Sequence, residues 1–99
     1  MNEKLTIVIP AFNEAKKIEA TINEVTGYLS GKGYGYELII VDDGSEDDTL
    51  DIIKRCKTLN SNGSIKILEN NPNRGKGYAV RKGIMEASGG YILFMDADN

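Results

Sequence analysis

Two pairs of acidic residues each follow an apolar run of the sequence. Asp42 and Asp43 end one run, and Asp96 and Asp98 end another. If the backbone stays extended, Asp96 and Asp98 are two residues apart and point to the same side. Two close carboxylates repel each other, and a divalent cation shared with a diphosphate relieves that repulsion. The acids therefore indicate metal-assisted chemistry on a phosphate-bearing ligand.

The composition restricts the metals and catalytic groups that the chain can supply. The 99 residues contain no histidine and one cysteine, so a zinc site and a nucleophile paired with histidine are excluded within them. Carboxylates, carbonyls and water remain as ligands, and they suit Mg²⁺ or Mn²⁺. A formal net charge of −3 argues against nucleic-acid binding by bulk electrostatics. Cys56 is expected on the core-facing side of a helix, without a catalytic role.

A segment rich in positive charge and glycine follows the third apolar run. The charge comes from four residues in or just after this loop: Arg74, Lys76, Arg81 and Lys82. Gly75 and Gly77 leave backbone N–H groups open to a ligand. Phosphate is the anion that would complete a site between these cations and the paired acids.

The apolar pattern predicts four strands that alternate with three helices. The strands are expected near residues 5–9, 37–41, 65–68 and 91–95, and the helices near 14–29, 46–59 and 77–87. Short connections between them predict a parallel sheet with right-handed crossovers, in strand order 3-2-1-4. The predicted fold class is therefore α/β, a three-layer α/β/α Rossmann-like arrangement around a four-stranded parallel sheet. Asn13 and Ser45 are expected to cap the first and second helices.

The carboxyl ends of the predicted strands form the edge where ligands bind in such a sheet. Both acid pairs and the segment 10–14 are expected at this edge. Each signal is ordinary alone, because residues 42–45 also fit a capped turn and Asp-x-Asp also fits a solvated strand end. A binding site is favoured because all of these motifs are predicted to lie on the same edge of one sheet.

The predicted sheet is small and ends on an acidic strand tip. We therefore expect residues 1–99 to be the N-terminal, ligand-binding part of a longer domain. The strand order places two helices on one face of the sheet and one on the other. This uneven cover suggests a homodimer.

Four motifs of the chain resemble, in order, the signatures of family-2 glycosyltransferases. They are residues 7–14 (IVIPAFNE), 41–49 (VDDGSEDDT), 73–79 (NRGKGYA) and 96–98 (DAD). The resemblance is closest to the subgroup of polyprenyl-phosphate (dolichol-phosphate) mannose or glucose synthases. It covers essentially the whole chain, but only the nucleotide-sugar-binding half of such an enzyme.

The resemblance implies a GT-A fold, a UDP- or GDP-sugar donor, Mg²⁺ or Mn²⁺, and inversion at the anomeric carbon. It also implies eight nucleotide-binding residues: Pro10, Ala11, Glu14, Asp42, Asp43, Arg74, Lys76 and Asp96. Asp43, together with Asp42, would bond to the base. Asp98 would hold the metal with Asp96, which the ribose shares. The metal would neutralise the departing diphosphate.

The same resemblance implies functions outside these residues. The general base and the acceptor site are expected beyond Asn99. Polyprenyl phosphate is the acceptor that the subgroup suggests. The expected location is the cytoplasm, at the cytoplasmic face of a membrane through segments outside this chain. We expect the 99 residues alone to bind nucleotide weakly and not to turn over.

Two other classes of function stay open from the sequence. Residues 39–43 also resemble the acidic strand end of receiver domains, which bind Mg²⁺ beside a phosphorylated aspartate. Against that class, the acids follow the second strand and no lysine-bearing fifth strand is predicted. A non-catalytic, self-associating module is the second class. A dinucleotide-binding domain is disfavoured because no Gly-x-Gly-x-x-Gly follows the first strand.

Overall fold

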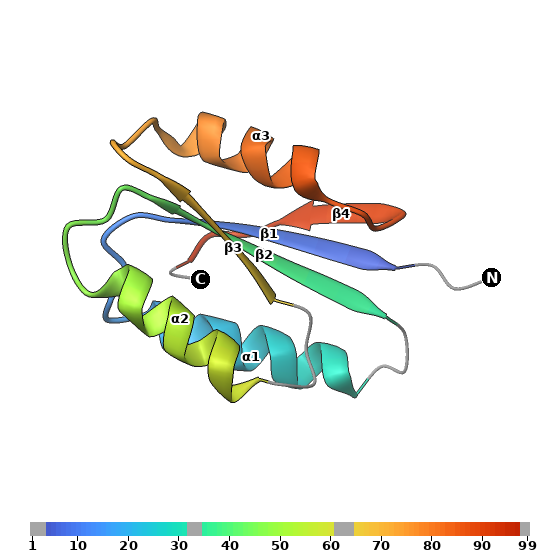
Figure 1. Cartoon of the computed structure of the whole chain (residues 1–99). Helices are drawn as coiled ribbons and strands as arrows, with labels where there is room; N and C mark the ends of the chain where they lie inside the picture. Colours follow the sequence, from blue (N-terminus) through green and yellow to red (C-terminus); the bar gives the residue numbers. More distant parts are fainter. Residues whose placement is uncertain (1–3, 32–34, 61–64, 98–99) are drawn as a thin grey trace.

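The computed structural model of the chain describes residues 4–31, 35–60 and 65–97. In chain order the elements are β1 (Leu5–Ala11), α1 (Ile18–Ser30), β2 (Tyr36–Asp43), α2 (Thr49–Leu59), β3 (Ile65–Asn70), α3 (Lys76–Glu86) and β4 (Tyr91–Phe94). The described strands form one parallel sheet in the order β3-β2-β1-β4 (Figure 1). The predicted fold class and strand order are therefore confirmed.

The helices cover the two faces of the sheet unequally. Side chains alternate between the faces along each strand, so Ile9 and Ile40 point to one face and Val8 and Ile39 to the other. The first face packs against α1 and α2, and the second packs against α3 (Figure 1). The prediction of two helices on one face and one on the other is confirmed.

The helices bury the apolar stripes that their spacing predicts. Ile18, Ile22 and Leu29 of α1 are buried in the larger core cluster, as is Cys56 of α2. Burial raises the pKa of the Cys56 thiol, and the charge of Glu19 raises it further. This confirms the prediction of a core-facing cysteine. No helix in the described ranges is both long and apolar enough to cross a membrane.

The predicted caps of α1 and α2 are wrong. Both helices begin later than expected, and neither N-cap residue makes a side-chain capping bond. Instead, the backbone N of Asn13 donates to Ser45 Oγ (2.9 Å), and the backbone N of Glu46 donates to Asn13 Oδ1 (2.8 Å). The side chains of Asn13 and Ser45 thus join the loop after β1 to the loop after β2.

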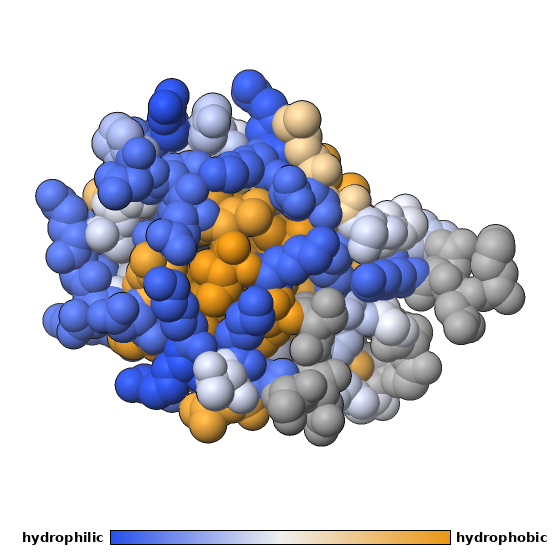
Figure 2. Space-filling model, viewed as in Figure 1, coloured by the Kyte–Doolittle hydropathy of each residue, from blue (hydrophilic) through white to orange (hydrophobic). Residues whose placement is uncertain are grey.

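The two edge strands of the described sheet differ in their surroundings. Figure 2 shows apolar surface between α3 and the α1–α2 pair, where Figure 1 draws β3. Ile67 and Leu68 of β3 are half-buried there. All four side chains of β4 are exposed, with exposed fractions of 42–62%. Hydrophobic burial therefore contributes little to the position of β4.

Candidate functional site

A cleft of about 400 Å³ opens at the carboxyl edge of the sheet. The segment that follows β1, the end of β2, the β3–α3 loop and the segment after β4 all contribute to its walls. Six of the residues predicted from the sequence line it: Pro10, Ala11, Glu14, Asp43, Lys76 and Asp96. The expected convergence on this edge is therefore present in the structure, while nucleotide binding by these residues stays a prediction.

The Asp43 carboxylate shapes one wall of the cleft. It is 3% exposed and accepts four hydrogen bonds from the last residue of β3 and the β3–α3 loop. Oδ1 accepts from Asn70 Nδ2 (3.0 Å) and the backbone N of Arg74 (2.8 Å). Oδ2 accepts from Asn73 Nδ2 (2.9 Å) and the backbone N of Gly75 (2.8 Å). These bonds fill all four lone-pair sites, so a bond from Asp43 to a base would displace one of the donors.

Asp42 lies beside Asp43 in the sequence but faces the other side of the sheet, because side chains alternate along a strand. It is also 3% exposed, and its Oδ2 accepts from the backbone N of Ser45 (3.3 Å). Its Oδ1 has no hydrogen-bond partner among the described residues. Asp42 lines a second hollow of about 410 Å³, between the β2–α2 turn and the β3–α3 loop. Asp43 thus lines the cleft and Asp42 the second hollow, while nucleotide binding by either acid stays a prediction.

Besides the acids Glu14 and Asp43, two charged residues line the cleft: Lys76, the first residue of α3, and Asp96, which follows β4. Their side chains form an ion pair, and both are more than half exposed. Water screens such a pair, so it contributes little to stability. The start of α3 also presents backbone N–H groups and the positive end of the helix dipole. An anionic ligand could therefore replace Asp96 as the partner of Lys76 at small cost.

The other predicted cations lie outside the cleft. The Arg74 guanidinium lies 5.5 Å from the centroid of the Tyr78 ring, and only its backbone N contacts the carboxylate of the cleft wall. Lys82 Nζ donates to the backbone O of Glu69 (2.8 Å) and to Asn70 Oδ1 (2.9 Å). Lys82 thus joins α3 to the end of β3. Arg74 is next to Gly75 of the cleft wall, and its nucleotide-binding role stays a prediction.

Three residues line the cleft that sequence reasoning did not select: Phe12, Asn73 and Ala97. All three lie inside the motifs 7–14, 73–79 and 96–98, so motif membership was a usable signal. Phe12 is 44% exposed despite its apolar ring. An exposed aromatic ring at the end of a buried strand is available to a planar ligand.

A divalent metal fits the cleft in one specific mode. The described part of the chain holds no cluster of three or more acidic, cysteine or histidine side chains arranged around a metal. Asp98, the second predicted ligand, lies outside the described residues. Mg²⁺ in nucleotide sites uses one or two carboxylates, and substrate phosphates and water complete its coordination. Asp96 in a cleft with an adjacent anion site matches this shared mode.

Comparison with protein-family models identifies the family of the chain. The model described as "Glycosyl transferase family 2" matches residues 6–99. The chain belongs to this family. It is 36% identical over 100 residues to the dolichyl-phosphate beta-glucosyltransferase of Drosophila melanogaster, covering 96% of this chain and 31% of that protein. It is 41% identical over 99 residues to the enzyme of the same name from Saccharomyces cerevisiae, covering 95% and 29%.

Solved structures agree with this assignment. The mannosyltransferase PcManGT from Pyrobaculum calidifontis, in complex with GDP-Man and Mn²⁺, superposes with a TM-score of 0.87 at 25% identity, over 99% of this chain and 28% of that one. Glucosyl-3-phosphoglycerate synthase from Mycobacterium tuberculosis, with Mn²⁺ and UDP, superposes with a TM-score of 0.76 at 25% sequence identity. The match covers 96% of this chain and 33% of that one. The chain therefore has the arrangement of a GT-A glycosyltransferase. It spans less than a third of the length of the two dolichyl-phosphate glucosyltransferases above.

Proposed function

We propose that this chain forms the donor site of an inverting glycosyltransferase, which transfers a sugar from a UDP- or GDP-sugar with the help of Mg²⁺ or Mn²⁺. The observation that carries the proposal is the cleft in which Lys76, Asp96 and the start of α3 meet. The names of the relatives support polyprenyl phosphate as the acceptor. The general base and the acceptor site would lie in other parts of the enzyme.

The diphosphate of the donor would lie between Lys76 and the start of α3. Gly75 favours a close approach, since it has φ +96° and no described atom lies within 4 Å of where a Cβ would be. Asp96 and Asp98 would hold the metal. When bound, the metal supplies electrostatic stabilisation of the departing diphosphate. Lys76 would leave Asp96 and bind the phosphate oxygens.

The nucleoside would lie toward Pro10 and Phe12, at the end of β1. The loop there is held in place, because the backbone N of Glu14 donates to Thr49 Oγ1 (2.8 Å) at the start of α2. A fixed loop loses little conformational entropy when a ligand binds. The Phe12 ring is exposed at the cleft and would pack against the base.

Calorimetric titration with UDP and with GDP, each with and without Mn²⁺, tests the proposal. We expect one nucleotide to bind, and more tightly with Mn²⁺. Asp96→Asn and Asp98→Ala should remove the Mn²⁺ dependence, whereas Lys76→Met should weaken binding with and without the metal. Asp48→Asn is the control, because Asp48 is exposed and lies outside the cleft. A folded chain that binds neither nucleotide would contradict the proposal.

The receiver-like alternative is disfavoured by the burial of its acids. A phosphorylated aspartate must be accessible, yet Asp42 and Asp43 are each 3% exposed. The homodimer, the location at the cytoplasmic face of a membrane and the absence of turnover by this chain alone are further proposals. Light scattering tests the first of these. Sugar transfer by the purified 99 residues would contradict the last.

A further inference from the structure

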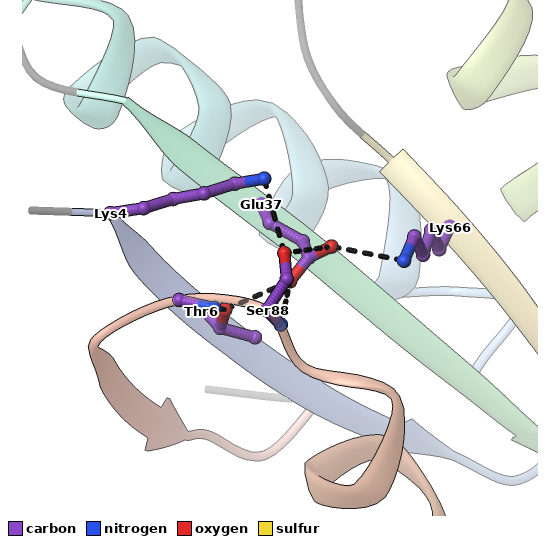
Figure 3. A network of polar contacts seen from close by, with 6 residues as sticks. Lys4, Thr6, Glu37, Lys66 and Ser88 are labelled. Carbon is purple, nitrogen blue, oxygen red and sulfur yellow. Dashed lines mark hydrogen bonds and ion pairs between the residues drawn. The ribbon is translucent and has the colours of Figure 1, made fainter. Parts of the chain in front are cut away.

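A buried glutamate lies at the amino edge of the sheet, opposite the cleft. Glu37, the second residue of β2, is 1% exposed. Its carboxylate accepts hydrogen bonds from Thr6 Oγ1 (2.9 Å) and from the backbone N of Ser88 (3.0 Å), and pairs with Lys66 Nζ (3.2 Å). Lys4 Nζ donates to Ser88 Oγ (3.2 Å), which also contacts the carboxylate (Figure 3). Glu37 thus joins β1, β3 and the connection from α3 to β4.

The charge on Glu37 is stabilised by these partners. Burial alone raises the pKa of this carboxyl, but the Ser88 N–H, the Thr6 hydroxyl and Lys66 outweigh burial and lower the pKa to about 2. Glu37 is therefore ionised at neutral pH, and its hydrogen bonds are of the stronger, charge-assisted kind. The contacts with Ser88 and Thr6 are those that reach toward β4.

The turn before β4 rests on this network. Gly89 N donates to Thr6 Oγ1 (3.0 Å), and Gly90 N donates to the backbone O of Lys4 (2.8 Å). A Cβ at Gly89 would come within 2.5 Å of Thr6 Oγ1, so the turn and β1 are in close contact. Glu37 accepts from Thr6 and Ser88 together. It therefore fixes the turn at the point where β4 begins.

β4 has few other contacts that hold it. It pairs with β1 alone in the described sheet, and all four of its side chains are exposed. Its far end enters the cleft, where Met95 N donates to the backbone O of Val8 (3.0 Å) and Asp96 follows. A four-residue strand is only about 13 Å long. A change of register of β4 along β1 would therefore move Asp96 with the strand, against the hydrogen bond that Thr21 Oγ1 donates to the backbone O of Ala97.

We propose that Glu37 is a positioning residue for the donor cleft: through Ser88 and Thr6 it holds β4 on β1, and so places Asp96. The metal-binding role of Asp96 belongs to the proposed function, and the inference rests on it. The hold on β4 itself does not depend on that function. Two separate measurements therefore test the two parts.

The variants are chosen to separate the turn from the rest of the network. Glu37→Gln keeps the shape and removes the charge, and Thr6→Val removes the hydroxyl between Glu37 and Gly89. Lys66→Met is the matched control. It removes the ion pair on the β3 side, and among the described residues Lys66 makes no hydrogen bond or ion pair with the turn. A positioning role predicts effects from the first two variants that the control lacks.

Hydrogen exchange measures the hold on β4, and calorimetry with Mn²⁺ measures its effect on the cleft. We expect Glu37→Gln and Thr6→Val to speed amide exchange at residues 89–95 and to weaken Mn²⁺-dependent nucleotide binding by about 3- to 30-fold. Binding without Mn²⁺ should change little. Lys66→Met should leave both measurements as in the wild type. A purely stabilising role would instead make Lys66→Met and Glu37→Gln alike in both.

Each result decides one part. Unchanged exchange at 89–95 in Glu37→Gln, or in Thr6→Val if the first variant does not fold, overturns the inference. Faster exchange with unchanged Mn²⁺-dependent binding overturns the link to Asp96 and leaves the donor site standing. If the wild type shows no metal-dependent binding, the proposed function fails, and the link to the metal site fails with it. The exchange data then still decide whether Glu37 holds β4.

Discussion

Two buried carboxylates lie on the same face of β2, one at each end of the strand. Asp43 at the carboxyl end takes its hydrogen bonds from one short segment, residues 70–75, which is the last residue of β3 and the loop after it. Glu37 at the amino end takes its bonds from β1, β3 and the turn before β4. The same chemistry thus gives two results. Around Asp43 the donors are close in sequence, and their bonds fix the shape of a loop that forms a cleft wall. Around Glu37 the donors are far apart in sequence, and their bonds join separate strands.

The largest effect is expected at Asp43. Asp43→Asn would turn an amide N–H₂ toward two of the donors and leave them unpaired and buried, at a cost of about 4 kcal/mol of unfolding free energy. Nucleotide binding should be lost as the loop changes shape. Urea denaturation and calorimetry measure the two effects.

Asp42→Asn is the matched control for this prediction. The two acids are neighbours with equal burial, but Asp42 Oδ1 has no described partner and Oδ2 has one long bond. Asp42→Asn should therefore lower the free energy of unfolding by less than about 1 kcal/mol. Equal losses in the two variants would mean that burial of the acid matters and its loop contacts do not.

The second prediction concerns pH and Glu37. Its pKa of about 2 lies below the ordinary value of 4.5, so its stabilisation is complete above pH 4.5 and is lost as the pH falls from 4.5 to about 2. The shift corresponds to about 3 kcal/mol at most. The facing charges are Lys66 and, through Ser88, Lys4.

Urea unfolding of the wild type and Glu37→Gln between pH 7 and pH 2 measures this loss. We expect a stability difference of about 2 to 3 kcal/mol at pH 7 that disappears near pH 2. Glu19→Gln, which changes an exposed acid, should show no such convergence. A constant difference across this range would show that the charge of Glu37 is not what stabilises the fold.

The sequence predicted those features that depend on local pattern. The apolar runs of β1 and β2 have core residues on both faces, so strand type and burial could be read directly. The strand order followed from short connections and right-handed crossovers. Asp42 and Asp43 at the end of β2, and Asp96 after β4, reached the predicted edge for the same reason.

The sequence could not predict contacts that compete over long separations. Asn13 and Ser45 are good caps locally, but each found a partner more than 30 residues away in the other loop. Glu37 is the second residue of a strand and has no local feature that marks it as buried, because its partners Thr6 and Ser88 lie 31 and 51 residues away. The alternation of side chains along a strand does predict that Asp42 and Asp43 face opposite sides of the sheet.

A third, smaller effect is expected where the segment after β4 meets α1. Thr21 Oγ1 donates to the backbone O of Ala97, whereas Thr26 Oγ1 donates to the backbone O of Ile22 within its own helix. Both threonines are buried. Thr21→Val should lower the free energy of unfolding by about 1 kcal/mol. Thr26→Val should lower it less, since the Ile22 carbonyl remains part of the helix backbone. Equal losses in thermal unfolding would contradict a role for Thr21 in holding this segment.

The smallest expected effect is the coupling energy of an exposed ion pair, compared with that of a pair of similar distance whose acid is buried. Arg55 and Glu19 lie 3.3 Å apart and are both about half exposed, while Lys66 and Glu37 lie 3.2 Å apart with Glu37 buried. The N–O distances are nearly equal, so distance alone predicts equal stabilisation. Solvent screening instead predicts a coupling below about 0.5 kcal/mol for the exposed pair in a double-mutant cycle.

The Lys66–Glu37 coupling should exceed that of the exposed pair and change less when salt is added, because screening by ions is weaker for buried charges. Cycles with Arg55→Met/Glu19→Gln and Lys66→Met/Glu37→Gln at low and high salt measure both quantities. Equal couplings would mean that the Thr6 and Ser88 hydrogen bonds, rather than the ion pair, account for the low pKa of Glu37. The amino edge would then resemble Asp43, whose partners are all neutral donors.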